Sequence, residues 1–245
     1  HYQPSNILIG VSGRFREAEL KRLVADLWTK RPKRKAGGFL KVTDMQTKSR
    51  VQVLSKETEQ AHIALGFKGF ANEDKRNSAV TVLSTILGGG MSSRLWDEIR
   101  EKRGLAYYVR CSGASYQDTG QFIVSAGVQT AKVEEAVQVI LSELQRTVDV
   151  LVSEKEILKA KEYLKGKTAL ALEDNQVRLD WYLDQVAFKK RVKTPQEAYD
   201  RIDAVTRSQV QVVAKQIFFT AQASLAVIGP FKDGSLQKSL EKILK

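Results

Sequence analysis

A run of three glycines, Gly88 to Gly90, stands shortly before two serines, Ser92 and Ser93. A glycine loop that opens a helix can bind phosphate, because its backbone N–H groups point at the anion. The residues around this run match neither the dinucleotide-binding fingerprint nor a P-loop. Taken alone, the pattern indicates a corner between two helices, in which glycine accepts positive φ and Ser92 or Ser93 caps the second helix.

Side chains that bind transition metals are scarce in this chain. It has two histidines, His1 and His62, and a single cysteine, Cys111. A catalytic zinc needs three protein ligands, and neither histidine has a histidine partner at ligand spacing. His62 lies in an apolar run, residues 61–65, where we expect a packed or edge-facing ring in a strand. The sequence therefore predicts no metal site within the chain.

The chain is strongly basic, with a formal net charge of +12 at pH 7. Basic clusters at residues 30–35 and 189–193 are of a kind that binds nucleic acid or an anionic surface. Pro32 and the glycine pair at 37–38 punctuate the first cluster, which we interpret as a linker. The second cluster follows a predicted helix. Its positive charges can stabilise the C-terminal end of that helix, where the helix dipole is negative. No recognition helix or basic strand with interleaved aromatics is present, so we expect no nucleic-acid partner and keep that function as the weakest alternative.

Hydrophobic periodicity predicts an α+β fold, with a mainly antiparallel sheet and helices packed on one face. Three capping boxes, each a serine or threonine followed three residues later by Glu or Gln, predict helix starts at Ser153, Thr194 and Thr206. Other apolar stripes predict helices near residues 72–87, 92–103 and 133–148. The expected strands are residues 50–54, 61–68, 107–116, 121–128 and 223–228.

Residues 87–107, LGGGMSSRLWDEIREKRGLAY, resemble the second-domain signature of the pitrilysin-type zinc peptidases, the family of mitochondrial processing peptidase and insulin-degrading enzyme. In that family a leucine-glycine loop precedes SRL, an acidic-hydrophobic-arginine turn and GLAY. The likeness extends to residues 58–62, 116–122 and 152–166, and covers roughly residues 50 to 230.

The resemblance implies that this chain is the substrate-binding C-terminal half of a zinc metalloendopeptidase and is inactive alone. The family's zinc motif, H-x-x-E-H, is absent here, so the zinc would belong to the N-terminal domain of the parent. Arg100 and Tyr107 match the arginine and tyrosine that reach the active site from the second domain, and both can donate hydrogen bonds to a substrate carbonyl. The loop of Gly88, Gly89 and Gly90 would lie at the domain interface.

The same resemblance leaves alternatives open. The parent is either a peptidase or, as in some members of the family, a non-catalytic structural or partner subunit. Its expected partners are a peptide or protein substrate and its own N-terminal domain or a homologous chain. Arg100 has a simpler interpretation as a surface ion pair with Asp97 or Glu101. The strand from Gln60 to Leu65, if it lies at an edge, could hold substrate by strand addition.

An internal repeat supports a two-domain parent. Residues 6–15 and 224–231 each form an apolar run that ends in Gly-x-Phe, and an apolar helical stripe follows both at a constant offset of 216. We therefore assign residues 1–45 to the last strand and helix of a preceding domain plus a linker, and residues 46–245 to the C-terminal domain. The first of these strands needs a sheet partner from outside its own segment.

No apolar run approaches the roughly 18 residues that a membrane span requires. The N-terminus has no basic-then-apolar signal pattern, and the compartment stays open between cytoplasm and periplasm.

Overall fold

The computed structural model describes residues 2–28 and 37–245. The basic cluster predicted as a linker, residues 30–35, lies outside the described residues. The chain divides into two compact units, one of residues 1–42 with 166–193 and the other of residues 43–165 with 194–245. The assignment of residues 1–45 to a preceding domain stays a prediction.

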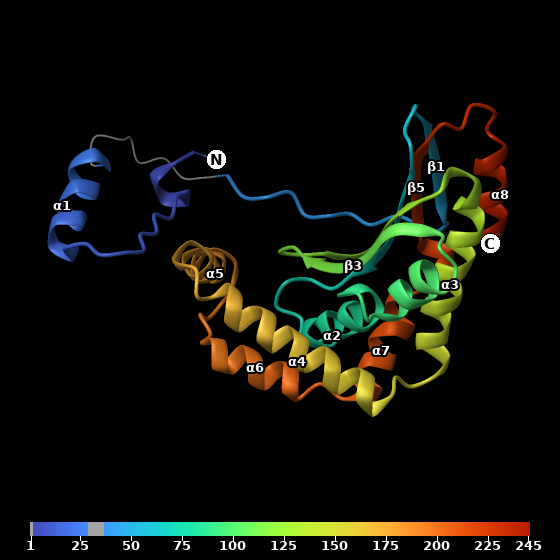
Figure 1. Ribbon diagram of the computed structural model, residues 1–245. Helices are drawn as coiled ribbons and strands as arrows, with labels where there is room; N and C mark the ends of the chain where they lie inside the picture. Colours follow the sequence, from blue (N-terminus) through green and yellow to red (C-terminus); the bar gives the residue numbers. More distant parts are fainter. Residues whose placement is uncertain (1, 29–36) are drawn as a thin grey trace. The chain divides into compact units, whose positions relative to one another are not determined.

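The larger unit is built on a five-stranded sheet of order β1-β5-β2-β4-β3 (Figure 1). β1 and β5 are parallel, and the other pairs are antiparallel. The predicted α+β class with a mainly antiparallel sheet is confirmed. The strands are β1 (Arg50–Ser55), β2 (Ala61–Gly69), β3 (Ala106–Ser115), β4 (Gly120–Val128) and β5 (Ser224–Gly229).

The central strand of this sheet is β2, and one prediction about it was wrong. β2 pairs with β4 along one side and with β5 along the other. The strand from Gln60 to Leu65 is therefore not an edge, and its backbone groups are not free to add a peptide strand. Side-chain alternation tells which face of a strand is buried but not where the strand lies in the sheet.

One face of the sheet is covered by helices and carries the core. Within β2 the side chains of Ala61, Ile63, Leu65 and Phe67 are buried, as the two-residue period of a strand requires. Phe218 contacts the rings of Phe67 and Phe122 edge to face, with centroids 5.4 and 5.1 Å apart. The helices of this unit are α2 (Asn77–Gly88), α3 (Val133–Asp149), most of α4 (Glu154–Ala171), α6 (Pro195–Asp203), α7 (Arg207–Ile217) and α8 (Ser235–Ile243), with short helical turns η2 (Trp96–Glu101), η3 (Thr130–Lys132) and η4 (Thr220–Gln222).

The three predicted capping boxes are present. At the start of α4 (Glu154–Ala171) the Ser153 N–H donates to Glu156 Oε2 at 2.8 Å, and the Glu156 N–H donates to Ser153 Oγ at 3.2 Å. Thr194 with Glu197 caps α6, and Thr206 with Gln209 caps α7 in the same reciprocal way. These helix starts depend on residues three apart in sequence, which explains why they could be predicted.

The smaller unit contains η1 (Pro4–Asn6), α1 (Glu17–Trp28), α5 (Asn175–Phe188) and the last turns of α4. The apolar segment predicted as a strand, residues 6–15, forms no strand in the structure. Leu8, Ile9 and Phe15 are about half exposed, at 51%, 51% and 48%. A strand needs a neighbour for its backbone hydrogen bonds, and the described residues of this unit include no other strand.

Candidate functional site

The glycine loop joins α2 to η2, but positive φ is not the reason for its glycines. α2 ends at Gly88, as predicted, yet Gly88, Gly89 and Gly90 all have negative φ. A Cβ on Gly88 would lie 2.4 Å from the backbone nitrogen of Cys111 in β3. Glycine is therefore required here because the end of α2 packs directly against the strand.

The helical turn after the loop is a π-helix, η2, and it lies within the helix predicted near residues 92–103. Leu95 and Ile99 are fully buried. The predicted serine cap is absent, since Ser93 Oγ donates back to the Gly90 carbonyl at 2.6 Å and the N-cap has no side-chain hydrogen bond. Gly104, with φ of +60°, ends the turn in the left-handed conformation. Single π-helical turns are frequent at functional sites.

Arg100 lies on η2, and its guanidinium donates no hydrogen bond to any residue that the structure describes. Its guanidinium lies over the Trp96 ring, 4.6 Å from the centroid. Asp97 pairs with Lys102 at 2.7 Å, and Glu101 accepts from Trp96 Nε1 at 2.9 Å. Among residues 2–28 and 37–245 no carboxylate forms an ion pair with Arg100. The surface ion pair with Asp97 or Glu101 is thus not what the structure shows.

Tyr107 lies on β3, an outer strand of the sheet, at a β-bulge. Ala106 pairs with Val128 and Tyr108 pairs with Gly127, so Tyr107 has no partner in β4. A bulge turns its extra side chain away from the regular pattern, and bulges are enriched next to active sites. Tyr107 is 52% exposed, and its hydroxyl has no hydrogen bond within the described part of the chain.

Contacts from α4 anchor the glycine loop on its far side. Arg94 donates to both Glu156 carboxylate oxygens, at 2.6 and 3.1 Å, and Lys159 Nζ donates to the Ser92 carbonyl at 2.9 Å. The Arg94 guanidinium lowers the pKa of Glu156 to about 2. Sequence reasoning missed these contacts because more than 60 residues separate the partners.

A cavity of about 460 Å³ opens between this loop and α4. The exposed Met91 and the ring of Tyr163 belong to its wall, together with the Arg94–Glu156 pair. The loop packs against β3 at Gly88 and is held to α4 by the Arg94–Glu156 pair and the Lys159 hydrogen bond. These contacts on two sides fix its position.

The candidate metal ligands do not fit a zinc site. His62 lies on the exposed face of β2, neither packed nor at an edge, and its Nδ1 is 3.2 Å from the Tyr108 hydroxyl. Burial raises the pKa of the Cys111 thiol, which disfavours the thiolate that zinc binds. Across residues 2–28 and 37–245, no group of three or more His, Cys, Asp or Glu side chains is arranged to hold a metal ion. None of the helices there is long and apolar enough to cross a membrane.

Fold and site together define a mixed α/β domain in which the side-chain donors of Arg100 and Tyr107 have no partner in the described part of the chain. The family model described as the Peptidase M16 inactive domain matches residues 1–164, and the chain belongs to this family. The resemblance to pitrilysin-type zinc peptidases is thereby confirmed.

Curated relatives agree with this assignment. A zinc protease of Streptomyces coelicolor, SCO5738, is 33% identical over an alignment 245 positions long, which covers 95% of this chain and 52% of the relative. The zinc protease YmxG of Bacillus subtilis is 33% identical over an alignment 233 positions long, which covers 94% of this chain and 55% of the relative. Both are named as uncharacterized. The chain spans about half the length of these relatives.

Solved structures share the fold at low identity. A protease from Helicobacter pylori gives a TM-score of 0.79 at 21% identity, covering 89% of this chain and 54% of its own. A peptidase M16 inactive domain from Pseudomonas fluorescens gives 0.78 at 20% identity, covering 89% and 52%. A chain of Complex III2 from Candida albicans gives 0.78 at 16% identity, covering 95% and 57%.

Proposed function

We propose that this chain is the substrate-binding C-terminal half of a zinc metalloendopeptidase and does not cleave peptides alone. We assign the zinc, its ligands and the glutamate base to an N-terminal half of the parent. Two relatives named as zinc proteases, each about twice the length of this chain, support the assignment. The observation that carries the residue roles is that Arg100 and Tyr107, on adjoining elements, have no hydrogen-bond partner for their side-chain donors within residues 2–28 and 37–245.

In this proposal Arg100 and Tyr107 stabilise the substrate carbonyl as water adds to it. The Trp96 ring supports the guanidinium from below by a cation–π contact, which leaves its five N–H donors available. The bulge at Tyr107 takes its phenol donor out of the regular side-chain alternation of β3. Donors that are already oriented stabilise developing negative charge without reorganisation, and such stabilisation acts on the transition state more than on the ground state.

The test uses the longer parent protein with both halves present and a quenched fluorescent peptide. Arg100→Ala should lower kcat by about 10²-fold with a much smaller change in KM, the loss expected for one transition-state donor. Tyr107→Phe removes only the hydroxyl and should cost about tenfold. Arg103→Ala is the matched control, since Arg103 is exposed and pairs with Glu98 at 3.4 Å.

Unchanged turnover in Arg100→Ala would overturn the assigned role. An equal loss in Arg103→Ala would also count against it, because a general charge effect would then explain the result.

The second candidate is a non-catalytic partner subunit of the same family. The observation in its favour is the likeness to a chain of Complex III2, which has the same fold. We favour the peptidase because the relatives named as zinc proteases share 33% identity, against 16% for that chain. A parent protein that cleaves no peptide with zinc supplied, while binding a homologous chain, would decide for the subunit.

A further inference from the structure

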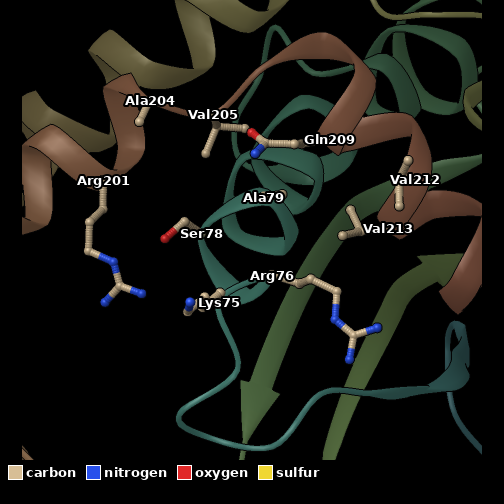
Figure 2. Close-up of a pocket in the computed structure, with 10 residues that line it drawn as sticks. All are labelled: Lys75, Arg76, Ser78, Ala79, Arg201, Ala204, Val205, Gln209, Val212 and Val213. Atoms are coloured by element: carbon tan, nitrogen blue, oxygen red, sulfur yellow. The ribbon is translucent and has the colours of Figure 1, made fainter.

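A second cavity, of about 490 Å³, opens between α2, α6 and α7, and it shares no lining residue with the cavity at the glycine loop (Figure 2). Its volume falls in the range of small-molecule sites. Its lining consists of Lys75, Arg76, Ser78, Ala79, Arg201, Ala204, Val205, Gln209, Val212 and Val213.

The lining carries three cations and no carboxylate, and one of the cations is already engaged. Arg76 donates to both Asp74 oxygens, at 2.9 and 2.6 Å, and its guanidinium lies 3.8 Å from the centroid of the Phe70 ring. The Arg76 guanidinium also lowers the pKa of that aspartate. Arg76 is therefore part of the wall rather than a free binding group.

Lys75 and Arg201 differ from Arg76 in having no such partner. Neither forms an ion pair or side-chain hydrogen bond within residues 2–28 and 37–245. They come from different elements, the loop before α2 and the end of α6, yet they line one cavity with the Ser78 hydroxyl between them (Figure 2). Two uncompensated cations and a hydroxyl donor favour an anion.

The rest of the cavity is apolar. Ala79, Val205 and Val213 are buried, at 4%, 4% and 1% exposure, and form its floor. Water against such a floor is displaced favourably by an apolar group. The cavity thus combines an anion-binding rim with an apolar floor.

We propose that this cavity binds a small molecule, or the last residue of a peptide, in which a carboxylate is joined to an apolar group. Lys75, Arg201 and the Ser78 hydroxyl bind the carboxylate, and the apolar group packs on Ala79, Val205 and Val213. The inference does not depend on the peptidase role.

The test is a titration of the 245-residue chain followed by the backbone amide signals of Ser78 and Ala79. The probes are N-acetyl-leucine and N-acetyl-leucinamide, which differ only in the carboxylate. The acid should bind at least about tenfold more tightly than the amide, since it gains charge-assisted hydrogen bonds. Lys75→Gln and Arg201→Gln should each weaken acid binding by roughly three- to tenfold.

Lys238→Gln is the matched control. It also removes one exposed positive charge, but Lys238 lies on α8 and outside the cavity. Both test residues are exposed, so their substitution leaves the core intact. Equal binding of acid and amide, equal weakening by Lys238→Gln, or shifts centred away from Ser78 and Ala79 would each overturn the proposal.

A six-residue peptide ending in leucine separates the two sources of the carboxylate. Binding as tight as that of N-acetyl-leucine, lost on amidation of the peptide, supports a peptide terminus as the ligand. Exclusion of the peptide while N-acetyl-leucine binds supports a free carboxylic acid.

Discussion

The two copies of the internal repeat have the same sequence pattern but different structures. At the C-terminal end, β5 lies between β1 and β2, and the side chains of Leu225 and Leu240 are buried. At the N-terminal end, residues 7–11 form no strand, and α1 buries none of its residues. The offset of 216 makes Ile9 the counterpart of Leu225.

The difference shows what a local pattern can and cannot produce. An apolar run and an amphipathic stripe specify a propensity, but most helical stability comes from packing, and a strand requires a neighbour. The C-terminal copy has neighbouring strands for β5 and a packing surface for α8 within its own unit. The N-terminal copy leaves Leu8, Ile9 and Phe15 about half exposed, as expected of a segment whose sheet belongs to the proposed N-terminal half.

The largest expected effect is a contrast between equivalent positions of the repeat. Leu225→Ala should lower the free energy of unfolding by about 2–5 kcal/mol, because the side chain is 2% exposed and its removal leaves a cavity. Ile9→Ala should cost less than about 1 kcal/mol, because Ile9 is 51% exposed. Urea unfolding followed by circular dichroism measures both. Equal losses would mean that the N-terminal copy is packed as well as the C-terminal one.

Alanine substitutions of two glycines, one in each unit, compare how tightly the backbone is packed there. Gly88→Ala should destabilise by about 2 kcal/mol or more, because the new Cβ meets the Cys111 backbone, which lies in a sheet and cannot yield. Gly10→Ala should be close to neutral. Its Cβ meets the terminal methyls of Leu179 and Leu183, which can move, and alanine reduces the entropy of the unfolded chain. Thermal unfolding of the two variants checks this, and a loss in Gly10→Ala as large as in Gly88→Ala would break the contrast.

The smallest expected difference between the two units is in the stability that an ion pair contributes to each. The pKa of Glu156 is lowered from 4.5 to about 2 by Arg94, so the pair stabilises the fold above pH 4.5, and this stabilisation is lost as the pH falls toward 2. Glu156→Gln should cost about 1 kcal/mol at pH 7, a discounted figure because 32% of the side chain is exposed, and much less at pH 2, where the carboxyl becomes protonated.

The control for this pair is Glu17→Gln in α1. Glu17 and Lys21 form an exposed pair at 2.6 Å, with 74% and 75% of their side chains accessible, so its loss should not be measurable. Urea midpoints of both variants at pH 7 and pH 2 provide the comparison. A Glu156→Gln loss of stability that is as large at pH 2 as at pH 7 would show that the charge of Glu156 is not its source.

Much of the larger unit could be predicted from sequence, because its signals are local. The alternation in β2 and the capping boxes at Ser153, Thr194 and Thr206 involve residues two or three apart. The central place of β2 could not be predicted, because it depends on β5, which lies more than 150 residues away. The serine cap before η2 was predicted wrongly because Ser93 bonds back to Gly90.

The candidate site was also predicted only in part from the sequence. The resemblance in residues 87–107 singled out Arg100 and Tyr107, whose catalytic roles stay predictions. Only the structure showed that Asp97 and Glu101 have other partners and that Tyr107 sits on a bulge. The anion-binding rim at Lys75 and Arg201 could not be predicted from the sequence, since each residue alone is an ordinary surface cation.

The sequence by itself determined the family, the fold class and the starts of α4, α6 and α7, because short motifs and two- or three-residue periods encode them directly. The tertiary structure alone decided which of two matching apolar segments became a strand, which strand lies in the centre, and which cations stay unpaired. Each of these outcomes depends on surfaces brought together from distant parts of the chain. No local pattern contains that information, because burial and pairing are properties of two segments and not of one.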